Sequence, residues 1–179
     1  MKYIYAIFTF ILMVNTSFSQ DRYITKQGTI SFFSHSPVED IKALNNQVLS
    51  IMDVESGDIA VSVLMKSFMF EKSLMQEHFN ENYVESDKFP KATFIGKILN
   101  IKDLGNTGIV LIEGDLTIHG ISNKIEVEAD IEAEGNIVSI TGVFNVLVAD
   151  YDIKIPSVVR NNIAKTIEIS FSLNHKEYN

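Results

Sequence analysis

The chain has 179 residues, with 15 Lys and Arg against 23 Asp and Glu, which gives a formal net charge of −8. It contains no cysteine, so disulfide bonds, thiol catalysis and thiolate metal sites are excluded. The acidic balance repels phosphate backbones and anionic lipid headgroups, so we expect neither nucleic-acid binding nor electrostatic docking onto a membrane.

Residues 1–19 have the pattern of a secretory signal peptide. Lys2 gives a positive start, residues 3–14 are mostly apolar, and Ser17 and Ser19 place small residues before the cleavage point. The apolar run is too short to span a bilayer comfortably, although an uncleaved N-terminal anchor is the alternative. We therefore expect export to the periplasm, cleavage after Ser19 and no stable membrane insertion. Loss of Lys2 leaves a single mature domain, residues 20–179, with a net charge of −9.

The mature sequence is dominated by segments in which apolar and polar residues alternate, the pattern of strands with one buried face. The clearest segment is Lys124 to Glu132, where every second residue from Ile125 to Ile131 is apolar and those between are acidic. Short turns such as His119-Gly120 favour antiparallel neighbours. The pattern predicts an all-β domain of about eight antiparallel strands, either a closed barrel or a sandwich. The predicted strands are Thr29–Phe33, Gln47–Asp53, Asp58–Phe70, Thr93–Asn100, Ile109–Ile118, Lys124–Glu132, Ile137–Val148 and Thr166–Leu173.

One segment, Ser73 to Tyr83, has the apolar spacing of a helix. Ser73 and Gln76 have the spacing of a capping box at its start. Pro90 favours an extended conformation at the residue before it and leads into the next strand. The preceding strand, Asp58–Phe70, becomes apolar on both faces toward its end, so we expect one face to meet the helix and the other to line the interior.

Three stretches carry a resemblance to a known family. Residues 67–94 run from Ser-Phe-Met-Phe through the helix to a Phe-Pro turn, residues 114–121 read Gly-Asp-Leu-Thr-Ile-His-Gly-Ile, and residues 151–157 read Tyr-Asp-Ile-Lys-Ile-Pro-Ser. In this order they resemble the YceI-like polyisoprenoid-binding proteins. The resemblance implies an eight-stranded antiparallel, lipocalin-like β-barrel with one short helix, an apolar channel that holds an isoprenoid chain, and a periplasmic location.

A channel for such a chain needs apolar and adaptable walls, because each buried CH₂ contributes about 0.8 kcal/mol and methionine fits irregular shapes. The same side chains can also fill a solid core; the residues alone favour that alternative and the resemblance reverses it. The candidate ligand-binding residues are Met65, Phe68, Phe70, Met75, Phe79, Phe94, Ile112 and Phe144, with Met69 as a further candidate.

The predicted function is that of a non-enzymatic protein that carries or sequesters a polyprenyl or quinone-like chain, without any other cofactor. No G-x-S-x-G nucleophile motif occurs, and the acidic residues fall mostly on outward strand faces. The main alternative is a structural or stress-related barrel module that stores no ligand. The sequence leaves the oligomeric state open, including a homodimer.

Two further features bear on the ligand. Haem or metal binding through His78 or His119 is a weaker alternative, because no histidine has a recognised ligand spacing from another and no cysteine assists. A polar lipid headgroup would need donors near the end of the barrel, whereas ordinary solubilising charges are the simpler interpretation of the same residues. The candidate donors are Lys66, Lys154 and Arg160, with Asn161 and Asn162 beside the arginine.

Overall fold

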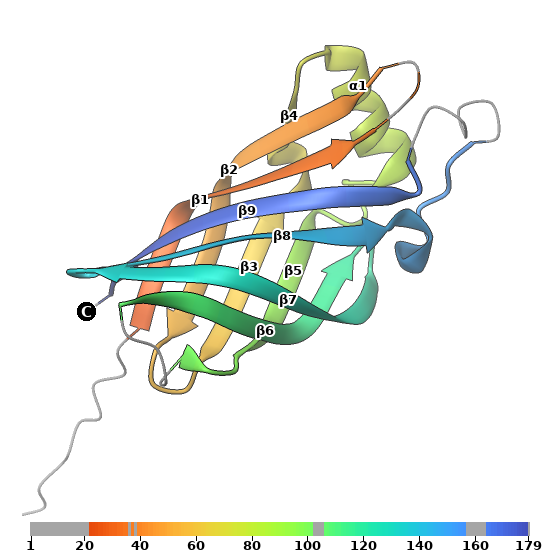
Figure 1. Ribbon diagram of the computed structural model, residues 1–179. Helices are drawn as coiled ribbons and strands as arrows, with labels where there is room; N and C mark the ends of the chain where they lie inside the picture. Colours follow the sequence, from red (N-terminus) through yellow and green to blue (C-terminus); the bar gives the residue numbers. More distant parts are fainter. Residues whose placement is uncertain (1–21, 36, 38, 102–105, 157–163, 179) are drawn as a thin grey trace, which may run out of the picture.

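A computed structural model describes residues 22–35, 37, 39–101, 106–156 and 164–178 (Figure 1). The predicted signal peptide and the candidates Arg160, Asn161 and Asn162 lie outside these residues. The longer strands are β1 (Arg22–Ser34), β2 (Ile41–Asp53), β3 (Asp58–Leu64), β5 (Lys91–Ile98), β6 (Thr107–Ile118), β7 (Ile121–Glu134), β8 (Ile137–Leu147) and β9 (Thr166–Glu177). The two-residue strand β4 (Met69–Phe70) and the helix α1 (Ser73–His78) lie between β3 and β5.

The described strands form one closed antiparallel barrel. Each of the eight longer strands pairs with two neighbours in the order β1-β9-β8-β7-β6-β5-β3-β2, and pairing of β1 with β2 closes the ring. The short strand β4 pairs with β2. Closure leaves no long unpaired edge, which selects the barrel over the sandwich. The predicted eight-stranded barrel with one short helix is confirmed.

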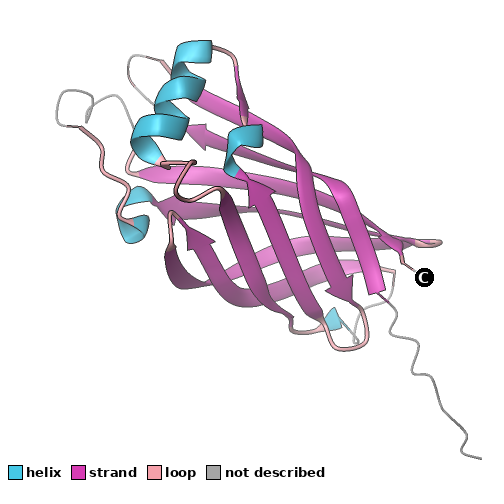
Figure 2. Cartoon of the chain, turned by 180° about the vertical axis from the view of Figure 1, so that it is seen from behind, coloured by secondary structure: helices cyan, strands magenta, loops and turns pink. Residues whose placement is uncertain are grey.

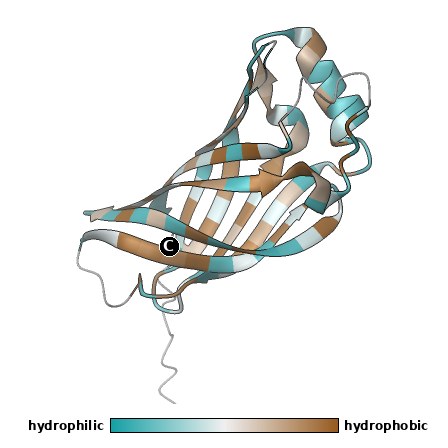
Figure 3. Cartoon of the chain, turned by 45° about the vertical axis from the view of Figure 1, so that its right-hand side comes forward, coloured by the Kyte–Doolittle hydropathy of each residue, from teal (hydrophilic) through white to brown (hydrophobic). Residues whose placement is uncertain are grey.

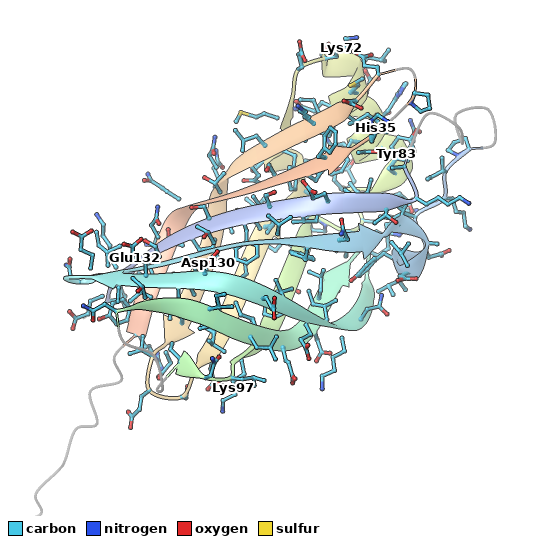
Figure 4. All side chains as sticks on the ribbon, viewed as in Figure 1. His35, Lys72, Tyr83, Lys97, Asp130 and Glu132 are labelled. Atoms are coloured by element: carbon cyan, nitrogen blue, oxygen red, sulfur yellow. The ribbon has the colours of Figure 1, made fainter. Side chains whose placement is uncertain are left out.

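Alternation along the strands separates a buried interior from a polar exterior. On β7 the side chains of Val127, Ala129 and Ile131 are buried, while Asp130 and Glu132 are exposed, as the sequence predicted (Figure 4). Hydrophobic and hydrophilic bands accordingly alternate along the strands in Figure 3. The sequence pattern therefore identified the inner face of this strand correctly.

The first two strands are longer than the sequence predicted, because their alternation is interrupted. The pairing of β1 with β2 shifts register on either side of Gly28, which lies opposite Val48. Such a bulge changes which residues point inward, so the period-two pattern is lost there. In β2 two inward side chains, Asn45 and Ser50, are also polar and fully buried. Because of both features, the alternation of apolar and polar residues does not predict the full length of these strands.

The predicted strand Asp58–Phe70 is wrong after Leu64. The chain makes a 3₁₀ turn, η1 (Met65–Ser67), before it enters β4. This turn changes the side-chain parity, so Met65 and Phe68 are both buried while Leu64 and Met69 are exposed. The apolar residues at both parities therefore reflect a turn in the chain. They do not indicate a strand covered on two faces.

The predicted helix, Ser73–Tyr83, is present as α1 followed by a π-helical turn, η2 (Phe79–Tyr83). The predicted capping box is wrong. Lys72 occupies the N-cap without a capping hydrogen bond from its side chain, and the Gln76 side chain instead accepts a hydrogen bond from the backbone N–H of Phe70, at 3.4 Å. Both helical segments lie over one end of the barrel (Figure 2). In the described ranges, no helix combines the length and apolar character needed to cross a membrane.

The two ends of the barrel are filled differently. We call the end beneath α1 and η2 the helix end, and the end with the β2–β3 and β7–β8 turns the packed end. At the packed end Met52, Ile98, Val110 and Ile140 are at most 1 % exposed and form one tight cluster. The side chains of the helix end, in contrast, surround open space.

Candidate binding cavity

The helix end of the barrel contains a cavity of about 270 Å³. Its wall is almost entirely aliphatic and aromatic, and among the described residues its polar members are Ser34, His78, Tyr83 and Tyr151. Within the part of the chain that the structure describes, no Lys, Arg, Asp or Glu contributes to this wall. A concave apolar surface of this kind suits a hydrocarbon or an uncharged ligand.

A second, smaller cavity of about 90 Å³ lies deeper in the barrel. It has an apolar wall apart from Thr93. The two cavities share part of their walls, so they are successive sections of one interior space. The shared residues are Ile30, Val63, Ala92, Leu116 and Phe144.

Four phenylalanines form an aromatic cluster in the wall of the larger cavity. Phe32 comes from β1, Phe68 follows η1, Phe70 belongs to β4 and Phe79 begins η2. Their ring centroids lie 5.0–5.7 Å apart in tilted, stacked and edge-to-face arrangements. Such contacts stabilise aromatic pairs by about 0.5–1.5 kcal/mol each beyond the burial of area. The cluster therefore fixes the helical segments over the barrel and gives the cavity a rigid aromatic side.

All eight ligand-binding candidates from the sequence line the interior space. The larger cavity is lined by Met65, Phe68, Phe70, Met75, Phe79 and Phe144, and the smaller one by Phe94, Ile112 and Phe144. Met69 is wrong as a wall residue, since it lies on the outside of β4 and is 52 % exposed. Contact of the eight residues with a ligand remains a prediction.

Sequence reasoning missed the opposite side of the same cavity. This side is formed by β1, β9 and the segment after β8, including the 3₁₀ turn η4 (Val148–Tyr151). Their apolar residues have the ordinary strand pattern, which does not distinguish a cavity wall from a filled core. The missed residues include Ile30, Phe32, Tyr151, Ile153, Ile167 and Ile169.

A histidine in the β6–β7 hairpin joins three segments at the helix end. His119 Nε2 lies 3.0 Å from Glu85 Oε2, and its Nδ1 lies 3.1 Å from the backbone oxygen of Tyr151. Hydrogen bonds from Lys88 and His119 hold the pKa of Glu85 below its usual value. Glu85 and His119 both have positive φ angles, 44° and 51°, which is uncommon for residues other than glycine. We call this arrangement the His119 latch.

The latch also bears on the metal alternative. Both ring nitrogens of His119 already have protein partners, while His78 lines the larger cavity. The described residues contain no group of three or more His, Cys, Asp or Glu side chains placed to hold a metal ion.

The candidate headgroup donors Lys66 and Lys154 line neither cavity, and Lys66 forms an exposed ion pair with Asp87.

An eight-stranded antiparallel barrel with an apolar interior space and a helical cap is a lipocalin-like barrel. The model of the YceI-like domain matches residues 21–175, so the chain belongs to the YceI-like family. No curated protein matches the sequence significantly.

Solved structures share this fold at low sequence identity. A polyisoprenoid-binding domain from Saccharophagus degradans, implicated in plant cell wall breakdown, has a TM-score of 0.78 at 13% identity, covering 89% of this chain and 99% of that chain. BcnA from Burkholderia cenocepacia has a TM-score of 0.71 at 17% identity, with 82% and 95% covered. The YceI protein of Campylobacter jejuni has a TM-score of 0.66 at 16% identity, with 81% and 90% covered.

Proposed function

We propose that this protein is an exported, non-enzymatic carrier or store for a neutral isoprenoid chain, such as a polyprenyl alcohol or a quinone. The observation that carries the proposal is the interior space of the helix end, with its apolar wall. The polyisoprenoid-binding domain of similar fold supports the choice of an isoprenoid among apolar ligands.

The physical argument for a chain-like ligand is burial of apolar surface. Each methylene taken from water into the cavity contributes about 0.8 kcal/mol, so a short section of chain provides useful affinity without polar contacts. The aromatic cluster and the flexible side chains of Met65 and Met75 provide a surface that can adapt to methyl branches.

The neutral headgroup follows from the polar groups of the wall. A diphosphate taken into this space would lose its hydration without gaining a cationic partner from the described wall, which is strongly unfavourable. An uncharged hydroxyl or carbonyl needs only one or two hydrogen bonds. Tyr83 can provide one, since burial raises the pKa of its hydroxyl and keeps the proton in place.

The non-enzymatic part of the proposal takes account of one Ser–His pair. Ser50 Oγ and His175 Nε2 lie 2.8 Å apart, a separation that also occurs between a nucleophile and its base. Both residues are fully buried at the packed end and line neither cavity. A substrate in the interior space would not reach them, so we interpret the pair as structural.

The ligand-free structural module is the competing function. A barrel with only a structural role has no need for a hollow half, because unfilled apolar space destabilises a core by about 24 cal/mol per Å³. In this barrel the packed end is filled and the helix end is not. This difference between the ends of one barrel favours ligand binding.

The test begins with organic extraction of the purified protein and mass spectrometry of the extract. Protein freed of lipid is then titrated with geranylgeraniol and with geranylgeranyl diphosphate, and complexes are counted by native mass spectrometry. We expect one molecule of the alcohol per chain and binding of the diphosphate at least tenfold weaker. Absence of a co-purified lipid together with absence of alcohol uptake would overturn the proposal.

Two neighbouring residues of α1 provide a matched pair of variants. Met75 lines the larger cavity, whereas Leu74 is 59 % exposed on the outside of the helix. We expect Met75→Glu to weaken alcohol binding at least tenfold, because it places a charge in the apolar wall. Leu74→Glu should bind as the unmodified protein does. Equal effects would show that the helix contributes in some other way than as a cavity wall.

A further inference from the structure

Inward-facing glycines occur together at the level where the hollow half of the barrel meets the filled half. Gly96 on β5 lies directly opposite Gly114 on β6, and Gly142 on β8 lies opposite Phe171 on β9. A glycine inside a strand leaves bare backbone where a side chain would otherwise fill the interior, and it often marks a close approach by another group.

Two phenylalanine rings occupy the space that these glycines leave. The Cζ atom of Phe94 lies 2.6 Å from the position that a Cβ would take at Gly96 and at Gly114. The Cζ atom of Phe171 lies 2.6 Å from the corresponding position at Gly142. Both rings therefore lie against bare strand backbone, and a side chain at any of the three glycines would displace them.

The same two rings lie where the interior space meets the packed end. Phe94 and Phe171 both line the smaller cavity and both pack against the core cluster of the packed end. One step further along the strands, the pairs Ile98–Ile112 and Ile140–Leu173 follow the glycine level, and all four side chains are buried. Ile112 and Leu173 also line the smaller cavity, so the interior space ends against the two rings and the side chains directly below them. We call Phe94 and Phe171 the aromatic floor.

We propose that the aromatic floor, Phe94 and Phe171, sets the length of isoprenoid chain that the barrel takes up. This inference rests on the proposed function. A dry cavity of about 150 Å³ holds benzene, so by proportion the larger cavity holds about ten carbon atoms, or two isoprene units. The smaller cavity brings the capacity close to three units. A fourth unit meets the rings or remains outside in water.

The floor is tested with three uncharged alcohols of increasing length: geraniol, farnesol and geranylgeraniol, with two, three and four isoprene units. For the unmodified protein we expect affinity to rise at least tenfold from geraniol to farnesol and to change less than twofold from farnesol to geranylgeraniol. Phe171→Ala and Phe94→Ala each remove six ring carbons, about the volume of one unit. Each should make geranylgeraniol bind at least fivefold more tightly than farnesol.

Two further variants keep the test informative if an alanine variant does not fold. Phe171→Leu removes less volume and should change the preference in the same direction by a smaller factor. Phe33→Leu is the matched control, because Phe33, on β1, lines neither cavity. The ammonium group of Lys42, on β2, lies over its ring. It should leave the order of affinities unchanged.

The outcomes separate the floor from the function. A plateau after farnesol that shifts to geranylgeraniol in the Phe94 and Phe171 variants, and not in the Phe33 variant, supports the floor. Affinity that rises equally with every added unit in the unmodified protein, or a plateau that no floor variant moves, overturns it and leaves the proposed function intact. Absence of binding by all three alcohols overturns both.

Discussion

The imidazole of His175 and the hydroxyl of Ser50 form a buried hydrogen-bonded pair. Their Nε2 and Oγ atoms lie 2.8 Å apart, and both side chains are fully buried. His175 Nδ1 lies 3.3 Å from the carbonyl oxygen of Val138. A carbonyl can only accept a hydrogen bond, so Nδ1 carries the proton and Nε2 accepts one from Ser50. The pair is satisfied with a neutral ring, and a second proton would break it.

This pair makes the stability of the protein dependent on pH. Burial lowers the pKa of His175 from 6.5 to about 4. As the pH falls below 6.5, the unfolded chain takes up the proton first, so stability is complete at neutral pH and is lost between pH 6.5 and 4. The loss from this residue should reach roughly 2 kcal/mol at about pH 5.

Urea unfolding of the protein and of His175→Gln at neutral pH and at about pH 5 measures this loss. Glutamine cannot be protonated, so the variant should lose about 2 kcal/mol less than the unmodified protein over that interval. The difference between the two proteins removes the contribution of the carboxylates. Identical losses would show that His175 is charged in the folded protein or exposed to water.

The buried side-chain amide of Asn45 should contribute strongly to the stability of the folded protein. Its Nδ2 donates to the carbonyl of Leu64 at 2.9 Å, and its Oδ1 accepts from the backbone N–H of Gln47 at 2.8 Å. The side chain thus joins β2 to the last residue of β3, where the chain turns into η1. Asn45→Ala would remove both hydrogen bonds at a fully buried position and should cost roughly 2–4 kcal/mol in urea unfolding.

The neighbouring residue provides the control for Asn45. Asn46 is exposed, and its side chain bonds only to Thr29 among the hydrogen bonds of the described residues. Asn46→Ala should cost less than about 0.5 kcal/mol. If the two variants lose the same stability, the Asn45 amide is not the bridge between β2 and β3.

The His119 latch predicts a local effect on the segment after the helix. His119→Asn keeps a residue type that tolerates positive φ but removes the ring that reaches both Glu85 and Tyr151. Losing one such contact, about 1.5 kcal/mol, should speed hydrogen exchange of the Val84, Ser86 and Phe89 amides roughly tenfold. His35→Asn removes an exposed pair with Asp40 and should not change these rates. Unchanged exchange in both variants would refute the latch.

Export predicts a defined N-terminus. If residues 1–19 are a signal peptide, protein recovered from the periplasm of an expressing bacterium should begin at Gln20 by N-terminal sequencing. Ser19→Leu places a large residue at the cleavage point and should leave the full chain attached to the membrane. Thr16→Val, outside the two small-residue positions, should be processed normally. A chain that keeps residues 1–19 in the cytoplasm would contradict export.

The strands that were predicted best from the sequence are those with one buried and one solvent-exposed face. β7 has this character along most of its length, so alternation alone located it and its inner residues. β2 has inward Asn45 and Ser50 and a shift in register, so its first half was missed. The turn at η1 was also missed, because apolar residues lie on both sides of Lys66 and Ser67 and resemble one continuous strand.

The cavity was predictable only in part, because a wall and a core use the same residues. Phe68 and Met75 were predicted as wall residues because large aromatic and methionine side chains suit an apolar channel. Isoleucines such as Ile167 and Ile169 in the opposite wall have the pattern of any buried strand and were not predicted. The depth of the hollow depends on where the Phe94 and Phe171 rings lie against glycines of other strands. That relationship joins residues far apart in sequence, and it appears only once the barrel register is known.

The methyl groups of four methionines test ligand binding inside the barrel most directly. Met65 and Met75 line the larger cavity, Met52 lies in the packed end, and Met69 is exposed on the outside. In a titration of ¹³C-methyl-labelled protein with farnesol, the Met65 and Met75 resonances should shift and saturate at one molecule per chain, while Met52 and Met69 stay in place. A shift of Met69 alone, or no saturable shift at Met65 and Met75, would contradict a ligand site inside the barrel.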